Sequence, residues 1–95
     1  MTAMDEPLLR EVRIELFGPF REFGKEHLLA LEGPVPYPEV VRVLACELGP
    51  GFAERAGRKT TTVIVNNRIA SRRSLEALEI RPGDKVAFAL LLGGG

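Results

Sequence analysis

The sequence closes on the stretch KVAFALLLGGG, which runs from Lys85 to Gly95. Seven consecutive apolar residues, Val86 to Leu92, lead directly into three glycines. The apolar run is too short for a membrane span and follows a turn signal, Pro82-Gly83-Asp84, so it predicts a buried β-strand. Glycine has no side chain with which to pack, so we expect residues 93–95 to form a flexible tail. A buried strand that leads into a bare glycine tail suggests that the tail itself is functional.

The overall composition is that of a single globular domain. The 95 residues are 45% apolar and 27% charged, as in ordinary soluble proteins. Thirteen basic and thirteen acidic residues balance, so no strong field favours binding to nucleic acid or to an anionic membrane. The single cysteine, Cys46, excludes an internal disulfide and a cysteine-cluster metal site. The single histidine, His27, argues against a histidine-based metal site, and we expect no metal.

The first eleven residues carry acids and a proline where a secretory signal would need basic residues and an apolar run. No apolar run approaches the length of a membrane span. We therefore expect a disordered leader over residues 1–11 and a cytoplasmic location.

The residues that follow predict two short strands. Apolar and charged residues alternate from Val12 to Leu16, the pattern of a half-buried strand. Gly18-Pro19 interrupts it, and a second segment, His27 to Leu31, ends at Gly33-Pro34. Two short strands joined by a loop of this length predict an antiparallel hairpin.

The period then changes to that of a helix. From Pro38, apolar residues recur at three- and four-residue spacing until Gly49-Pro50 stops the pattern. Proline suits the first helical turn, and Glu39 there complements the helix dipole. This is the one long helix that the sequence predicts, and residues 51–59 are expected to be a loop.

The second half of the chain predicts more strands. Thr60 to Val65 is rich in β-branched residues, Asn66-Asn67 supplies a tight turn, and residues 68–70 form a short returning strand. Residues 75–80 are expected to cross over, with at most a single helical turn, before the final strand.

This element order predicts an α+β fold. A mixed sheet of four to five strands would pack on one main helix, with the first and last strands side by side in its centre. That is the β-grasp, or ubiquitin-like, arrangement, and we place it over residues 12–92.

Three stretches resemble a known family, the small ubiquitin-like sulfur carriers of bacteria. Residues 12–23, VRIELFGPFREF, look like the first strand and following loop of the small subunit of molybdopterin synthase. Residues 63–67, VIVNN, look like the turn after its third strand. Residues 84–88, DKVAF, followed by Gly94-Gly95, look like the last strand and tail. The terminal glycine pair on this strand order is the specific feature, because each other stretch alone would be weak.

The resemblance implies a sulfur carrier with no turnover of its own. In the family, a partner activating enzyme adenylates the C-terminal glycine with ATP, and sulfur transfer then yields a thiocarboxylate. By resemblance these roles fall on Gly94 and Gly95. The sulfur would pass to a substrate held by the large subunit of molybdopterin synthase, and the carrier itself would bind no cofactor.

Strand alternation predicts a docking surface at the base of the tail. If Val86, Phe88 and Leu90 face the helix, then Ala87, Ala89 and Leu91 face outward. Phe17 lies on the polar side of the first strand, and Ile69 matches a position that the family uses for its partner. The predicted partner-binding residues are therefore Phe17, Ile69, Ala89, Leu91 and Gly93, because exposed apolar patches usually mark interfaces.

The sequence also departs from the family. Molybdopterin-type carriers often have an aromatic residue where Ala89 stands and prolines where Leu90 and Leu91 stand. Three terminal glycines are closer to some thiamine-type carriers. The length of the chain and residues 16–23 favour the molybdopterin side. A carrier for thiamine or another sulfur metabolite stays open, as does a non-catalytic ubiquitin-like binding module with an idle tail.

A few other residues carry separate expectations. Phe17 fits either the surface patch or the core, whereas Phe88 is expected in the core. Cys46 lies beside helical leucines and is expected to be a buried, inert thiol. His27 has no visible acidic partner and is expected to be structural. Arg72-Arg73 is read as a solvated turn, with contact to an acidic partner as the alternative.

Overall fold

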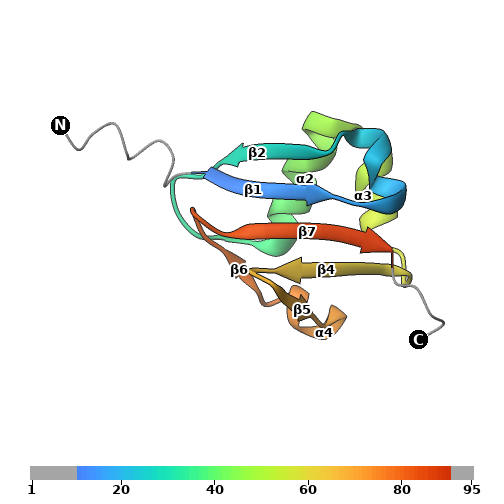
Figure 1. Ribbon diagram of the computed structural model, residues 1–95. Coiled ribbons are helices and arrows are strands. Elements are labelled where there is room, and N and C mark those ends of the chain that lie inside the picture. Colours follow the sequence, from blue (N-terminus) through green and yellow to red (C-terminus); the bar gives the residue numbers. More distant parts are fainter. Residues whose placement is uncertain (1–10, 91–95) are drawn as a thin grey trace.

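The computed structural model describes residues 11–90. Its main element is a five-stranded mixed sheet with the strand order β2-β1-β7-β4-β5 (Figure 1). The strands are β1 (Glu11–Leu16), β2 (Glu26–Ala30), β4 (Thr61–Val65), β5 (Arg68–Ala70) and β7 (Lys85–Leu90). The predicted strands are therefore all present, with boundaries that differ by one or two residues.

Strand β7 lies in the centre of the sheet between β1 and β4. It pairs in parallel with β1, where Ile14 is opposite Val86, and antiparallel with β4, where Val63 is opposite Phe88. The remaining pairs, β1 with β2 and β4 with β5, are antiparallel. This confirms the predicted central pairing of the first and last strands.

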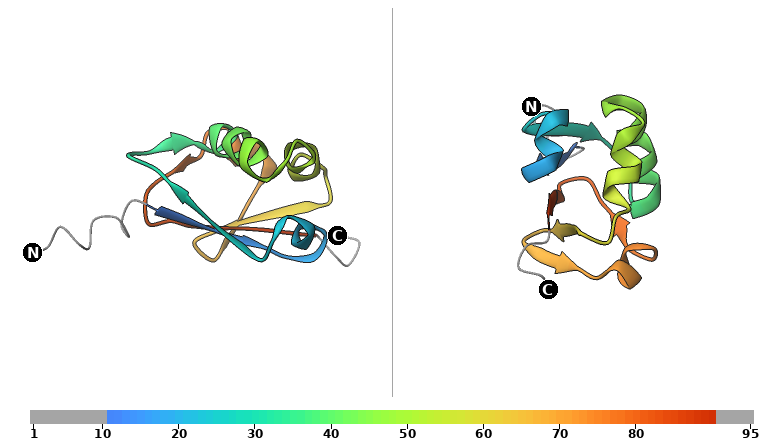
Figure 2. Two further views of the ribbon diagram at one scale, coloured as in Figure 1. Left: turned by 90° about the horizontal axis from the view of Figure 1, so that it is seen from above. Right: turned by 90° about the vertical axis from the view of Figure 1, so that its right-hand side faces the viewer.

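The α-helices lie on one side of this sheet (Figure 2). They are α2 (Tyr37–Leu48), α3 (Gly51–Ala56) and α4 (Arg72–Leu75). The 3₁₀ helix η2 (Gly18–Phe23) follows the end of β1. A separate two-stranded sheet joins β3 (Val35–Pro36) to β6 (Glu79–Ile80). None of the helices within residues 11–90 is long and apolar enough to cross a membrane.

Helix α2 begins and ends where the sequence predicts. Pro38 lies in its first turn, and Gly49 ends it with a backbone φ of 129°, a conformation that side chains other than glycine rarely adopt. Its buried face carries Tyr37, Val40 and Leu44, at the spacing of one helix face.

Helix α3 corrects the prediction of a loop over residues 51–59. Phe52 and Ala56, one turn apart, are both buried against the core. Two apolar positions among glycines and charged residues give too weak a periodic signal to be recognised in the sequence. The packing of Phe52 stabilises this short helix, because isolated helices of this length are unstable in water.

Aromatic rings form the centre of the core. Phe52 lies edge-on to Phe88 with ring centroids 5.0 Å apart, and Phe20 lies 5.6 Å from Phe88, within the range of favourable aromatic pairs. All three side chains are buried. They come from η2, α3 and β7, so the core joins the last strand to the helices that lie beside it, and the prediction of Phe88 as a core residue is confirmed.

The predicted turn at Asn66-Asn67 is present, with φ values of 51° and 70°. Asn tolerates this left-handed conformation better than most residues. The Asn66 side chain also accepts a hydrogen bond from the backbone N–H of Lys85 at 2.9 Å and donates one to Asp84 at 3.0 Å. The turn is thereby attached to the start of β7.

Candidate interaction surface at the end of the last strand

The face of the sheet that points away from the helices carries two adjacent rows in which most residues are small or apolar. In the first row, Ala87 lies between Glu15 of β1 and Ile64 of β4, and Ile64 is in turn opposite Ile69 of β5. In the second row, Ala89 is opposite Thr62. Phe17 extends β1 on the other side, where its N–H donates to the carbonyl of Phe88 at 3.0 Å.

The apolar members of the two rows make one surface, which we call the outer-face patch. Ile69 is 75% exposed and Phe17 is 41% exposed, while Ile64 and Ala89 are half-buried. Ala87 is buried because side chains on both neighbouring strands flank it. The patch consists of Phe17, Ile64, Ile69, Ala87 and Ala89.

This geometry answers the open question about Phe17, which lies on the surface and not in the core. The structure brings Phe17, Ile69 and Ala89 onto one face, as alternation predicts for Phe17 and Ala89 and the family resemblance for Ile69. That they bind a partner remains a prediction. The predicted site residues Leu91, Gly93, Gly94 and Gly95 lie outside the described residues.

Sequence reasoning missed Ile64 as a member of the patch. The run from Thr60 to Val65 is β-branched on both faces, so its pattern does not tell which face is outward. Only the strand register shows that Ile64 faces outward, since it pairs with both Ala87 and Ile69.

The side chain of Leu90 corrects a second expectation. It was predicted to anchor β7 in the core, but it is 39% exposed. By alternation Leu90 should share the face of Val86 and Phe88, which are fully buried. However, Leu90 belongs to the last pair of the β4–β7 ladder, where the strand extends beyond the core. A Cβ placed on Gly18 would lie 3.8 Å from the Cβ of Leu90, so η2 begins directly beside this residue.

Arg21 holds the aromatic end of the patch in place. Its Nε donates to the carbonyl of Leu16 at 2.7 Å, and its guanidinium carbon lies 5.9 Å from the centre of the Phe17 ring. That distance is within reach of a cation–π contact. Phe17 is therefore packed under a positive charge while one part of its ring remains accessible.

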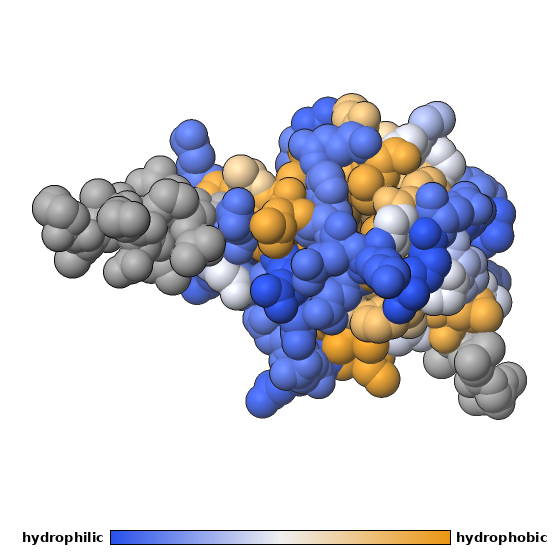
Figure 3. Space-filling model, turned by 45° about the horizontal axis from the view of Figure 1, so that its top comes forward, coloured by the Kyte–Doolittle hydropathy of each residue, from blue (hydrophilic) through white to orange (hydrophobic). Residues whose placement is uncertain are grey.

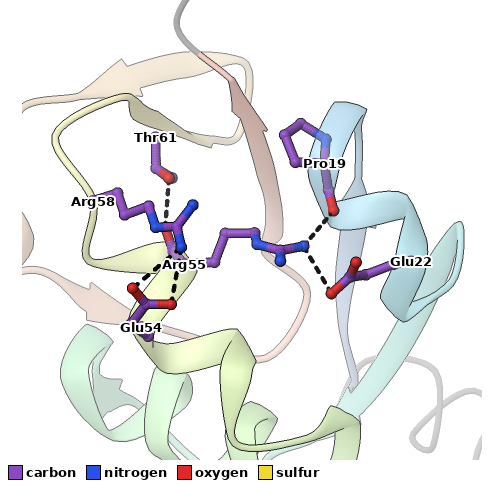
Figure 4. Close-up of polar contacts among 6 residues, drawn as sticks. All are labelled: Pro19, Glu22, Glu54, Arg55, Arg58 and Thr61. Carbon is purple, nitrogen blue, oxygen red and sulfur yellow. Dashed lines mark hydrogen bonds and ion pairs between the residues drawn. The ribbon is translucent and has the colours of Figure 1, made fainter.

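Arg55 connects α3 to η2 (Figure 4). Its Nη1 donates to the carbonyl of Pro19 at 2.7 Å and forms an ion pair with Glu22 at 2.9 Å. The hydroxyl of Thr61 donates to the Arg55 carbonyl at 2.7 Å, which joins the same helix to the start of β4. These contacts fix η2, which carries Gly18 and Phe20, next to the end of β7.

The other end of the outer face is charged. Arg13 forms an ion pair with Glu26 at 3.1 Å, and Lys85 is opposite Arg13 in the ladder. Leu28 is the exposed apolar residue at this end, at 51% exposure. The outer-face patch thus starts at the next outward-facing residue of β7, Ala87, and continues toward the end of that strand.

The prediction for Cys46 is wrong, whereas the surroundings of His27 agree with the structural role predicted for it. Cys46 is exposed and not buried, because it is two positions from the buried Leu44 and hence on nearly the opposite side of the helix. His27 does have an acidic neighbour, since its Nε2 lies 2.5 Å from a carboxylate oxygen of Glu47. The contact joins β2 to α2 at the surface, which is consistent with a structural role.

Arg72 is exposed, as expected of a solvated segment, but it lies in the short helix α4 and not in a turn. Its guanidinium donates to the carbonyls of Gly57 and Arg58 at 2.7 and 2.8 Å, so it closes the end of α3. Arg73 is exposed. Within residues 11–90, no group of three or more His, Cys, Asp or Glu side chains is arranged to hold a metal ion.

No protein-family model and no curated protein matches the chain. Solved structures do. The crystal structure of SAMP1 from Haloferax volcanii is 16% identical, with a TM-score of 0.70 over 90% of this chain and 99% of that one. The small archaeal modifier protein 1 from Methanosarcina acetivorans is 21% identical, with a TM-score of 0.67 over 90% and 96%. The thiamine biosynthesis protein ThiS from Geobacter metallireducens is 20% identical, with a TM-score of 0.53 over 87% and 99%. These likenesses show that the chain has the predicted β-grasp, ubiquitin-like fold.

Proposed function

We propose that this protein is a ubiquitin-like sulfur carrier whose C-terminal glycine carboxylate is the reacting group. The observation that carries the proposal is the sequence of β7, a central strand that passes the outer-face patch and leads into Gly93-Gly94-Gly95. Similar folds in SAMP1 and ThiS support it. The proposal requires a free carboxylate on Gly95.

The chemistry follows from the weakness of a carboxylate as an electrophile. A partner enzyme would let the Gly95 carboxylate attack the α-phosphate of ATP, which forms an acyl adenylate and releases pyrophosphate. A sulfide-level sulfur from the partner would then attack the acyl carbon and displace AMP. The product is a thiocarboxylate, which a second enzyme can use as its sulfur donor.

Glycine suits the delivery of this carboxylate. Five residues follow Leu90, and a fully extended segment of that length reaches at most about 18 Å. An enclosed active site admits a chain without side chains most easily, and glycine can adopt whatever backbone conformation that site imposes. Ordering such a segment costs conformational entropy, so contacts elsewhere must compensate. The outer-face patch offers those contacts next to the end of β7.

For the recipient, we propose the molybdopterin pathway, with this chain as the small subunit of molybdopterin synthase and its large subunit as partner. The support is the resemblance of residues 12–23 and 84–88. The similarity to ThiS, a thiamine biosynthesis protein, supports a thiamine-type carrier equally. Purification of the native protein with its acceptor enzyme separates the two, because each pathway has a different large partner.

A second candidate function is protein modification. The solved structure from Methanosarcina acetivorans is described as a small archaeal modifier protein. The same acyl adenylate could be attacked by a lysine amine of another protein, which would give an isopeptide bond and release AMP. Conjugates of higher mass that contain a Gly95-to-lysine linkage would identify this activity.

Intact-mass spectrometry tests the carrier proposal. The protein is incubated with the activating enzyme encoded in its own cells, ATP and a sulfur source. We expect a mass gain equal to the difference between sulfur and oxygen, located in the C-terminal peptide. The protein lacking Gly94-Gly95 is the control and should gain nothing. An unchanged mass in the full-length protein, or unchanged function after the deletion, would instead indicate a binding module with an idle tail.

A further inference from the structure

A cavity of about 560 Å³ lies between the first turn of α2, helix α3 and helix α4. That volume is typical of ligand-binding sites. The apolar part of its lining comes from all three helices and consists of Pro38, Val41, Ala53, Ala56 and Leu75. These helices lie on the side of the sheet opposite to the outer-face patch (Figure 2). The cavity is therefore a separate surface.

Two arginines, Arg72 and Arg73, are among the residues that line this cavity. Arg72 is held in position by its hydrogen bonds to the carbonyls of Gly57 and Arg58. Among residues 11–90, neither arginine forms an ion pair with a carboxylate. Glu76 is the acidic residue of the lining, so positive charge exceeds negative charge around the cavity.

Tyr37 adds a neutral hydrogen-bonding group to the wall. Burial raises the pKa of its hydroxyl well above the ordinary value, and nearby Arg72 offsets only part of that effect. The hydroxyl is therefore protonated at neutral pH. Within the described part of the chain it makes no hydrogen bond to another side chain or to the backbone, which leaves it available to a ligand.

We propose that this cavity binds an acidic peptide segment of a partner protein. An apolar side chain of the segment fills the space between Val41, Ala53 and Leu75, and a neighbouring carboxylate pairs with Arg72 and Arg73. The chain as a whole has no net charge, so the excess of positive charge around the cavity is a local feature. This local positive charge favours an acidic partner. The apolar lining selects a peptide over a bare anion, since phosphate has no group to place there.

The lining of the cavity is mixed, since apolar side chains lie beside two arginines and Glu76. Such a lining favours an amphipathic segment over a flat apolar partner. Figure 3 shows the other side of the molecule, with the outer face of the sheet and its β2 edge toward the viewer. The proposal does not depend on the reaction at Gly95. A partner bound here would leave the outer-face patch and the end of β7 accessible to an enzyme.

The test is an NMR titration of the full-length protein with a short capped peptide that alternates leucine and glutamate. Saturable shifts are expected at the backbone amides of Val41, Ala53 and Gly57, with none at Ile69. The matched peptide with glutamine in place of glutamate should bind about two- to fivefold more weakly, the range of an exposed ion pair. Equal binding of the two peptides, or shifts centred on Ile69, would overturn the proposal.

The variant Arg73→Glu should weaken binding by about fivefold or more, because it converts an attraction into a repulsion. Lys25→Glu changes the net charge equally and is the control. Lys25 directly precedes β2, at the edge of the sheet opposite to β5, so this variant should bind as the wild type does. Equal losses in both variants would show a non-specific effect of charge and contradict a defined site.

Two further measurements exclude other occupants. Inorganic phosphate at the same concentration should not produce the shifts, and if it does, the site is one for small anions. A protein lacking residues 1–10 should show the same spectrum around the cavity before peptide is added. If the deletion alone shifts Val41, Ala53 and Gly57, the acidic N-terminal residues of the chain itself are the occupant, and the assignment to a partner is wrong.

Discussion

The backbone N–H of Phe17 donates to the carbonyl of Phe88 at 3.0 Å, which continues the parallel pairing of β1 and β7 beyond the last paired residues. This contact places the exposed ring of Phe17 on the same face as Ala89, the next residue after Phe88. Because alternate residues point to opposite faces of a strand, one hydrogen bond links a core ring, Phe88, to a surface ring, Phe17. Replacement of Phe17 and replacement of Phe88 should therefore have different effects.

Phe17→Asp should impair recognition by the activating enzyme with little loss of stability. The ring is 41% exposed, so its removal costs little core packing, whereas aromatic anchors often dominate an interface. We expect the rate of adenylate formation to fall by about tenfold, measured as ATP-dependent release of pyrophosphate.

Leu28→Asp is the matched control for that experiment. Leu28 is exposed on the same face but at the charged end, next to the Arg13–Glu26 ion pair. Adenylation by this variant should be close to that of the wild type. A similar loss in both variants would show that the outer-face patch is not the docking surface.

Phe88→Ala should destabilise the fold strongly. The side chain is fully buried and lies against Phe20 and Phe52. Loss of a buried phenylalanine costs about 3 to 5 kcal/mol of unfolding free energy, which equilibrium urea denaturation measures. A cost below about 1 kcal/mol would contradict the central position of this ring.

Local patterns in the sequence reveal the elements that are buried on one face only. Strong alternation from Val12 to Leu16 and the helical spacing after Pro38 identified β1 and α2, because burial on one face imposes those periods. Alternation also gave the correct face for Phe17 and Ala89. The strand order then followed from the fold class.

The remainder depends on tertiary contacts that no local pattern contains. Helix α3 exists because Phe52 has a place in the core, and Leu90 is exposed because the strand extends beyond that core. Ile64 joins the patch only through its register with Ala87 and Ile69. The cavity bordered by Arg72 combines three segments that are distant in the chain, so its residues could not be grouped from their positions in the sequence.

Arg55→Met should loosen η2 against α3. The substitution removes the hydrogen bond to Pro19 and the ion pair with Glu22, while it also removes a buried Nε that has no hydrogen-bond partner. The loss of the two contacts outweighs the benefit of removing the unpaired Nε. We therefore expect a destabilisation of about 1 to 2 kcal/mol and faster amide exchange at Phe20 and Gly24.

Arg58→Met provides the reference for this measurement. Arg58 is an exposed residue whose side chain pairs with Glu54 one turn away in sequence, and such pairs contribute about 0.5 kcal/mol or less. Exchange at Phe20 and Gly24 should stay at the wild-type rate. If both variants behave alike, the contact between Arg55 and η2 does not stabilise that helix.

The ionisation of Tyr37 should make the fold sensitive to alkaline pH. Burial raises the pKa of its hydroxyl in the folded protein, whereas the unfolded chain should ionise near the ordinary value of about 10. A raised folded pKa contributes stability that is complete below the unfolded pKa and is lost as the pH rises toward the folded pKa.

Tyr37 is the only tyrosine of the chain, so phenolate absorbance reports this one group. We expect its native titration to begin above about pH 10 and the unfolding free energy to decline over the same range. In Tyr37→Phe that decline should be smaller, and an unshifted titration of the folded protein would show that the hydroxyl is solvated.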